Sequence, residues 1–322
     1  MTQPTERLVQ ANGIRLHVAE LGSGPAVLLC HGWPESHYSW RHQMTALAAA
    51  GYRAIAPDMR GYGDSDSPAD PAAFTLLHLV GDMVGLLDAL GIETAVVVGH
   101  DWGAPVAWNG TLMRPDRFTA VAGLSVPYRP RSPSQADPVS IVEVMRRRGL
   151  DGFYMVHFQT PGVEAQFDRD PGEAMRRILY ALSGDNEAGW RGMVGPGGTL
   201  IETMPGPDRL PGWLTEADVA FYAARHRKSG FRGGLNWYRN LDRNNELLAP
   251  WAGAKVRVPA LFIAGTRDPV LGIPGFKDAA TRLPQSCSDL RGVHLIEGAG
   301  HWVQQERPSD VNAALLAFLG GL

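Results

Sequence analysis

One segment of the sequence combines a buried-strand pattern with a reactive side chain. Residues 96–98 are three valines, and Gly-His-Asp-Trp-Gly follows them at 99–103. Small residues on both sides of a central polar residue allow the sharp strand-to-helix turn that exposes a nucleophile at the end of a strand. A serine usually takes the central place in this turn, whereas here the residue is Asp101.

An aspartate at this turn indicates chemistry at an sp3 carbon. A serine alkoxide that attacked such a carbon would leave an ether, which the enzyme could not easily cleave. A carboxylate leaves an ester instead, and a water activated by a base can attack the ester carbonyl. Asp101 therefore predicts alkyl transfer from an electrophilic carbon, followed by hydrolysis.

The second step needs a base, and residues downstream can supply it. Asp268 comes shortly after the apolar run 260–264, and His301 lies in a glycine-rich loop after the run 293–297. The order nucleophile, acid, histidine is typical of enzymes with this turn. We expect His301 to deprotonate the water, and Asp268 to fix the tautomer of His301 and stabilise its charged form. His100, beside the nucleophile, is interpreted as a packed residue.

Hydrolysis of an ester also needs donors for its oxyanion. The segment His-Gly-Trp-Pro at 31–34 follows the first buried core strand, where a backbone N–H is expected, and the residue after the nucleophile offers a second one. We assign these N–H groups to Trp33 and Trp102. Pro34 has no N–H and is expected to shape the loop. A cis peptide bond before Pro34 is one way to do so.

Several large apolar side chains flank the proposed catalytic residues or lie in the expected lid. They could line an apolar substrate pocket, although packing in the core is an equally good interpretation of each. The candidates are Trp33, Trp102, Met155, Phe158 and Trp302.

The pattern of apolar runs predicts an α/β protein with a mostly parallel sheet flanked by helices. Residues 1–127 and 251–322 carry the α/β pattern, whereas 128–250 has helical fragments and no strand-like runs. The simplest account is one core interrupted by a helical cap, which covers the carboxyl ends of the strands. The predicted elements are a hairpin at 8–20, strands at 26–30, 53–57, 95–99, 118–126, 260–264 and 293–297, and helices at 40–50, 74–90, from about 104, at 276–283 and at 311–319.

The composition is that of an ordinary globular protein. The 322 residues are 44% hydrophobic and 20% charged, with a formal net charge of −3, so electrostatics give no reason to expect a nucleic-acid partner. The first residues lack an apolar signal region and no run reaches the length of a membrane span, so we expect a cytoplasmic protein without a membrane partner. The two cysteines form neither a disulfide framework nor a metal site.

Four segments make the sequence similar to a known family. They are residues 31–34, 58–65, 99–103 and 300–302. On these motifs the chain resembles the soluble epoxide hydrolases of the α/β-hydrolase fold over nearly its whole length. The resemblance implies that fold with a helical cap, and an enzyme that needs neither a metal nor another cofactor. The implied substrate is a small epoxide, which water converts to a vicinal diol. The oligomeric state stays open between monomer and homodimer.

In this family two tyrosines of the lid hydrogen-bond the epoxide oxygen. The first lies just before a Phe-Gln-x-Pro-Gly segment, which Tyr154 precedes here at 158–162. The second lies in an Asn-Trp-Tyr-Arg-Asn segment, which occurs here at 236–240 and includes Tyr238. The chemistry requires such groups, because opening the ring places negative charge on an oxygen. A phenol, with a pKa of about 10, stays protonated at neutral pH and can donate its proton.

Two alternatives share parts of this pattern. Haloalkane and fluoroacetate dehalogenases also use an aspartate at the turn, but the former usually have Asn where Trp33 stands and the latter Arg where Trp102 stands. The two lid tyrosines favour an epoxide. The other alternative is a hydrolase-fold protein that binds a small ligand without turnover, against which the complete set of catalytic residues argues. Asp64, in the glycine-rich segment 58–65, is interpreted as structural.

Overall fold

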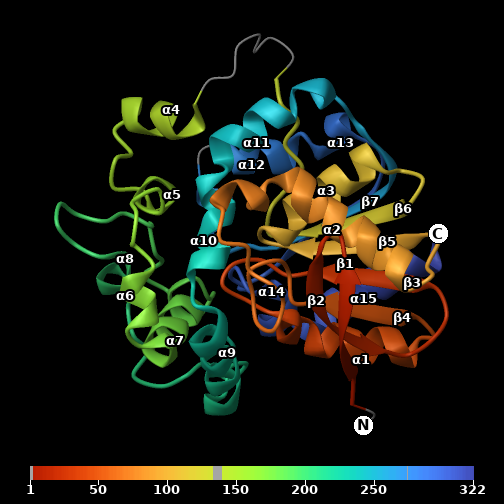
Figure 1. Ribbon diagram of the computed structural model, residues 1–322, viewed down its shortest axis with the longest axis horizontal. Helices are drawn as coiled ribbons and strands as arrows, with labels where there is room; N and C mark the ends of the chain where they lie inside the picture. Colours follow the sequence, from red (N-terminus) through yellow and green to blue (C-terminus); the bar gives the residue numbers. More distant parts are fainter. Residues whose placement is uncertain (1–2, 133–139, 274) are drawn as a thin grey trace.

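The computed structural model describes residues 3–132, 140–273 and 275–322 (Figure 1). Within these ranges eight strands form one sheet in the order β1-β2-β4-β3-β5-β6-β7-β8. β2 is antiparallel to both of its neighbours, and every other pair is parallel, as the sequence predicted. The strands are β1 Thr5–Ala11, β2 Ile14–Leu21, β3 Ala26–Cys30, β4 Arg53–Pro57, β5 Ala95–His100, β6 Phe118–Leu124, β7 Val256–Gly265 and β8 Cys287–Ile296.

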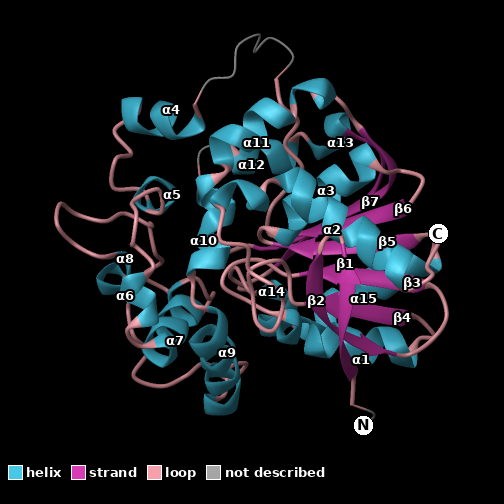
Figure 2. Ribbon diagram, viewed as in Figure 1, coloured by secondary structure: helices cyan, strands magenta, loops and turns pink. Residues whose placement is uncertain are grey.

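Helices pack on both faces of this sheet (Figure 2). Leu28 and Cys30 of β3 belong to a buried apolar cluster that includes residues of α2 and α3. Val27 and Leu29 belong to a second cluster, with residues of α1 and α15. Since successive residues of a strand point to opposite faces, β3 has to be apolar throughout. The helices of the core are α1 Arg41–Ala49, α2 Leu76–Ala89, α3 Gly103–Met113, α12 Phe276–Thr281, α13 Leu283–Ser286, α14 Val303–Glu306 and α15 Pro308–Gly320.

The turn residues act as their types predict. Asn12 and Gly13, between β1 and β2, have φ angles of 48° and 79°, so the predicted hairpin is confirmed with a turn in the left-handed region. The predicted strands at 26–30 and 53–57 have the observed bounds of β3 and β4. The predicted elements of the first half of the core therefore follow from local signals.

Two predictions near the carboxyl end needed correction. The helix predicted at 276–283 is divided into α12 and α13, because Pro284 has no N–H to continue the hydrogen bonds of the first helix. The strand predicted at 293–297 begins earlier, at Cys287. β8 is the edge of the sheet and is half exposed, so its first half carries polar residues that hide the strand pattern.

The chain between β6 and β7 is helical in the part that the structure describes, apart from one isolated bridge between Phe153 and Met193. In Figure 1 most of these helices lie beside the sheet, and α10 and α11 lie between them and the core. No helix of the described residues is long and apolar enough to cross a membrane. The helices are α4 Ile141–Arg147, α5 Tyr154–His157, α6 Ala165–Asp168, α7 Pro171–Ala181, α8 Leu200–Thr203, α9 Glu216–Ser229, α10 Arg232–Arg239 and α11 Leu241–Leu247.

The closest packing in the core lies where α3 begins. A Cβ atom on Gly103 would lie 2.0 Å from the carbonyl oxygen of Cys30, and a backbone oxygen has no room to move away. We expect Gly103→Ala to lower the free energy of unfolding by about 1–3 kcal/mol or more, because the helix must shift away from β3. Urea denaturation measures this. Gly320→Ala is the control, since no atom lies within 4 Å of its added Cβ; equal midpoints for both variants would contradict the packing argument.

Candidate active site

Asp101 lies at the turn between β5 and α3, at the carboxyl end of the strand. Its φ angle is 49°, in the left-handed region, which residues other than glycine rarely occupy. Two glycines make the turn possible, because a Cβ atom on Gly99 would lie 2.0 Å from the carbonyl oxygen of Gly103. The backbone therefore has the strained strand-to-helix geometry that the sequence predicted, and the residue is 8% exposed.

Backbone donors hold the carboxylate of Asp101. The N–H of Trp33 donates to Asp101 Oδ1 at 2.7 Å, and the nearby backbone of Trp102 helps to lower the pKa of the carboxylate. Gly32 allows this close approach, since a Cβ there would lie 2.3 Å from Oδ1. The peptide bond between Trp33 and Pro34 is cis. Of the two residues that the sequence analysis assigned to an oxyanion site, Trp33 thus hydrogen-bonds Asp101 through its backbone, and Trp102 directly follows Asp101 in the chain.

His301 and Asp268 come from the loops after β8 and β7. His301 Nε2 lies 3.5 Å from Asp101 Oδ2, and its Nδ1 lies 3.1 Å from Asp268 Oδ1. Asp268 is itself oriented by the N–H of Val270, which donates to Oδ1 at 2.9 Å. The imidazole of His301 therefore lies between the carboxylates of Asp101 and Asp268 and contacts one with each ring nitrogen.

Neighbouring charges determine the protonation states of His301 and Asp101. Burial disfavours the imidazolium of His301, but the charge of Asp268 and hydrogen bonds to Asp101 and Asp268 outweigh it and raise its pKa to about 10. Burial would raise the pKa of Asp101, yet the hydrogen bond and charge of His301 lower it below the ordinary value. Asp101 and His301 consequently form an ion pair at neutral pH.

Sequence reasoning missed Ser125. Its Oγ lies 2.9 Å from His301 Nδ1, so Ser125 and Asp268 share the same ring nitrogen. Ser125 directly follows β6 and has a φ angle of 69°. The sequence did offer one signal. Ser125 follows a strand, and the carboxyl end of that strand lies at the same edge of the sheet as Asp101.

Glu35 is a second residue that the sequence did not reveal. It accepts hydrogen bonds from the side-chain amides of Gln304 and Gln305 at 2.9 and 3.0 Å. Its Oε2 lies 2.7 Å from His100 Nδ1, and the other ring nitrogen of His100 lies 2.7 Å from the carbonyl oxygen of His301. Both ring nitrogens of His100 are therefore engaged in holding the His301 loop, which agrees with the interpretation of His100 as a packed residue.

The two lid tyrosines lie together above the nucleophile. Tyr154 begins α5 and Tyr238 belongs to α10, and their ring centroids are 5.9 Å apart. Gln159 links the two elements, since its Nε2 donates to the carbonyl oxygen of Tyr238 at 3.0 Å. Burial and the nearby charge of Asp101 raise the pKa of both phenols well above 10, so both stay protonated.

Two cavities meet at these residues. The larger has a volume of about 680 Å³ and the smaller about 40 Å³, and Asp101, Tyr154 and Tyr238 line both. A cavity of the larger volume is in the range of pockets that hold a small organic ligand. Most other side chains of the larger cavity are apolar, among them Leu76, Trp102, Val126, Ile141, Met155, Leu241, Leu248, Val270 and Phe276.

Two of the expected pocket residues lie behind the cavity walls. Trp102 and Met155 line the larger cavity and Trp33 lines the smaller one. Phe158 and Trp302 are fully buried and line neither. Phe158 packs against Trp33 with ring centroids 5.2 Å apart, and Trp302 Nε1 donates to the carbonyl oxygen of Leu179 at 2.8 Å. For these two residues the packing interpretation holds.

Comparison with known proteins identifies the class. A model of the α/β hydrolase fold family matches residues 25–308, so the chain is an α/β hydrolase. Epoxide hydrolase A of Mycobacterium tuberculosis is 48% identical, over 100% of this chain and 99% of the relative. Epoxide hydrolase 3 of Siraitia grosvenorii is 44% identical, over 99% of both chains.

A solved structure gives the same result. An epoxide hydrolase from an endophytic Streptomyces is 46% identical and has a TM-score of 0.94, with 100% of this chain and 96% of that chain covered. The chain belongs to the epoxide hydrolases of the α/β-hydrolase fold, and the resemblance that the sequence motifs indicated is confirmed.

The ion pair predicts that the charge of Asp101 raises the pKa of His301. In Asp101→Asn the negative charge next to His301 Nε2 is lost, so the imidazole should titrate at a pH lower by about one unit or more. NMR of protein labelled at histidine nitrogens measures this, with His301→Gln to assign the signal. His294→Gln is the control for indirect effects, because His294 is exposed on β8. An unchanged titration in Asp101→Asn would contradict the pairing.

Proposed function

We propose that this chain hydrolyses an epoxide to a vicinal diol through a covalent ester on Asp101. One observation carries the proposal: an ionised carboxylate faces two protonated phenols across a mostly apolar cavity. A nucleophile on one side and proton donors on the other are what ring opening of an epoxide needs. A dehalogenase would instead need donors for a departing halide. The membership in the epoxide hydrolase family supports the same conclusion.

In the first step the two oxygens of Asp101 have different tasks. Oδ1 is held by the N–H of Trp33, whereas Oδ2 lies on the side of His301. We infer that Oδ2 attacks an epoxide carbon, forms the new C–O bond and breaks the ring C–O bond. Tyr154 and Tyr238 share the developing charge on the ring oxygen, which takes up a proton from one phenol.

Formation of the ester prepares the second step. The alkylated Asp101 no longer carries a charge, so the pKa of His301 falls, although Asp268 still raises it. The proton that His301 releases can restore the phenol through solvent. Neutral His301, oriented by Asp268 and Ser125, then takes a proton from the attacking water.

The hydrolysis uses the oxygen that did not attack. Oδ1 becomes the carbonyl oxygen of the ester and stays next to the N–H groups of Trp33 and Trp102. These donors stabilise the tetrahedral oxyanion. Its collapse breaks the bond to the alkyl oxygen, which takes up the proton of the hydroxyl that came from water. The diol then leaves, Asp101 is a carboxylate again, and His301 keeps the proton that it took from the water. The preorganised donors explain why the loop 31–34 must approach Asp101 so closely.

The nucleophile and the base can be separated by experiment. With styrene oxide and a long-chain aliphatic epoxide, wild type should form diol and Asp101→Ala should not, because no ester can form. His301→Gln should form the ester but hydrolyse it slowly, by about 100-fold or more. Intact-protein mass spectrometry should then find the enzyme with the mass of one epoxide added.

The controls distinguish the alternatives. His294→Gln should keep full turnover, since this residue is exposed and lines neither cavity. Normal turnover by His301→Gln would rule out His301 as the base. If wild-type protein formed no diol from either epoxide, halide release from haloalkanes or fluoroacetate would be tested next. Stoichiometric capture of an epoxide by wild type without turnover would indicate a binding protein.

The tyrosines should act mainly on the first step. Tyr154→Phe or Tyr238→Phe keeps the ring packing but removes one donor, so single-turnover alkylation should slow by roughly 10–100-fold. The double variant should lose more than either single one, because nothing remains to protonate the oxygen. Tyr180→Phe, outside both cavity linings, is the matched control. An unchanged alkylation rate in the double variant would end the assignment.

A further inference from the structure

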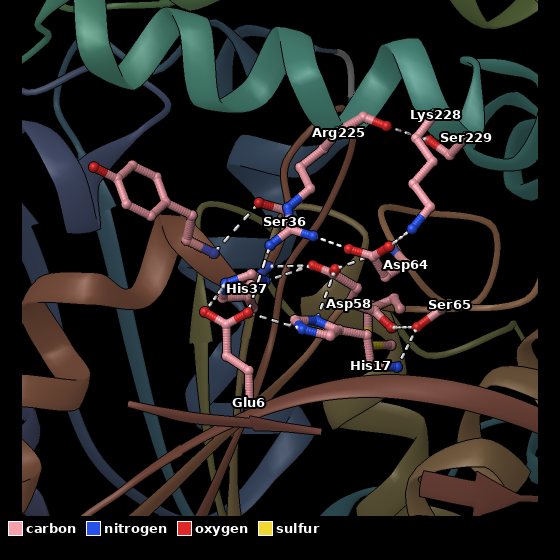
Figure 3. A network of polar contacts seen from close by, with 12 residues as sticks. Glu6, His17, Ser36, His37, Asp58, Asp64, Ser65, Arg225, Lys228 and Ser229 are labelled. Atoms are coloured by element: carbon pink, nitrogen blue, oxygen red, sulfur yellow. Dashed lines mark hydrogen bonds and ion pairs between the residues drawn. The ribbon is translucent and has the colours of Figure 1, made fainter. Parts of the chain in front are cut away.

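A second group of ionisable side chains lies outside the site just described. His17 belongs to β2, His37 begins the short helix η1 (His37–Trp40), and Asp58 directly follows β4. All three side chains are buried, and Figure 3 shows them pointing toward one another below α9. We call these three residues the His17 cluster. None of them lines the cavities at Asp101, so the proposed epoxide chemistry leaves the cluster unexplained.

The surroundings of His17 do not suit a neutral imidazole. Its Nε2 lies 3.0 Å from Glu6 Oε2, and its Nδ1 lies 3.0 Å from Asp58 Oδ2. Ionised carboxylates only accept hydrogen bonds, and a neutral imidazole has one N–H to give. With the proton on Nε2, the lone pair of Nδ1 faces a carboxylate oxygen. Nδ1 is also a buried atom without a well-directed hydrogen bond.

His37 repeats this arrangement from the other side of Asp58. Its Nδ1 lies 2.8 Å from Asp58 Oδ1, and its Nε2 lies 3.8 Å from Glu6 Oε1. Asp58 is held in place by the backbone N–H groups of His37 and Asp64, which donate at 3.0 and 3.3 Å. One fixed carboxylate thus lies between two imidazole nitrogens, so each nitrogen either donates a proton to it or shares it with a bound cation.

We propose that the His17 cluster binds a divalent transition-metal ion of the zinc class. The ligand atoms are Nδ1 of both histidines and the carboxylate of Asp58, which lie within 4.8 Å of one another. Imidazole and carboxylate are donors that zinc uses, and in a tetrahedral site they lie roughly 3.3 Å apart. A shift of roughly an ångström by one ring closes that difference.

Glu6 supplies the outer contact that such sites have. Histidines that bind a metal usually donate the other ring N–H to a carboxylate, which fixes the tautomer. Glu6 takes this place at His17 Nε2. The side chain of Glu6 is 43% exposed, so an ion can reach the cluster from this side.

Two cations of α9 approach the cluster, and their charges are matched elsewhere. Arg225 and Lys228 both pair with Asp64, and Arg225 Nη2 also lies 3.6 Å from Glu6 Oε2 (Figure 3). Asp58 makes no ion pair with either cation among the described contacts, so its charge remains for an ion held by the histidines. Such an ion would join β2, η1 and the segment after β4 and act as a structural site.

Cobalt(II) is the probe that tests this proposal. Untagged full-length protein, dialysed against a chelator and then against buffer, is titrated with Co²⁺ while visible absorption and heat are recorded. We expect one ion per chain, visible bands typical of a low-coordinate Co²⁺ site with nitrogen ligands, and loss of these bands when Zn²⁺ is added. His37→Gln should weaken binding at least tenfold and abolish the bands, whereas the matched His294→Gln should bind as the wild type does.

The experiment distinguishes a missing metal site from a misfolded variant and from a wrong assignment of the enzyme activity. Diol formation and the circular dichroism spectrum of His37→Gln show whether the variant is folded, and Co²⁺ binding by the wild type needs no epoxide. If the wild type gives neither bands nor heat, the cluster holds protons and the proposal is wrong. Equal affinity of wild type and a folded His37→Gln would place the ion elsewhere and also overturn it.

Discussion

The structure depends on keeping one carboxylate charged inside the protein. Asp101 is 8% exposed, and moving an ionised carboxylate away from water is expensive unless donors and an opposite charge replace the water. The N–H of Trp33 and the imidazolium of His301 provide these contacts. The glycines at 32, 99 and 103 are required for the same reason, because any side chain there would enter the space of the turn or of the carboxylate.

The same charge couples the two halves of the proposed reaction. Asp101 and His301 titrate as a pair, so neither has a protonation state of its own. An imidazole with a pKa near 10 is a poor base at neutral pH, which protects the free enzyme from premature proton transfer. Consumption of the carboxylate by the substrate removes one of the two charges that raise the pKa of His301 and so lowers that pKa. The base then becomes available when the ester that needs it is present.

The sequence could predict what local patterns encode. Asp101 was found from the strand and glycines around it, and the loops of Asp268 and His301 from the strands before them. Ser125 follows a strand as Asp268 does, but neither it nor Glu35 was recognised, because their partners at His301 and His100 lie far along the chain. The first half of β8 was missed since an edge strand needs no continuous apolar run.

Residue type also cannot separate a cavity wall from the layer behind it. Met155 lines the larger cavity, whereas Phe158 on the next turn packs behind Trp33 and Tyr238. Trp302, next to His301, points into the core and hydrogen-bonds the lid helix α7 at Leu179. Both side chains are large, apolar and close to the site in sequence. Only the direction of each side chain, which packing decides, determines its role.

Arg60 and Gly61 of the segment 58–65 show how residues without chemistry of their own fix the site. Arg60 is buried in an ion pair with Asp82, with Nε 2.7 Å from Oδ2, and this pair holds the segment against α2. A Cβ on Gly61 would meet the backbone of Gly233 at 2.9 Å, so α10 can approach only because both residues are glycines.

The same contacts set the place of the second tyrosine. Trp237 Nε1 donates to the carbonyl oxygen of Arg60 at 3.1 Å, and its ring packs edge-on against Tyr62 with centroids 5.5 Å apart. Tyr238 is the next residue of α10 and packs against Trp102 on its other side, with ring centroids 5.1 Å apart. The glycine-rich segment of the core thus positions a phenol of the lid over the nucleophile. A motif far from the reacting atoms in sequence therefore belongs to the same functional unit.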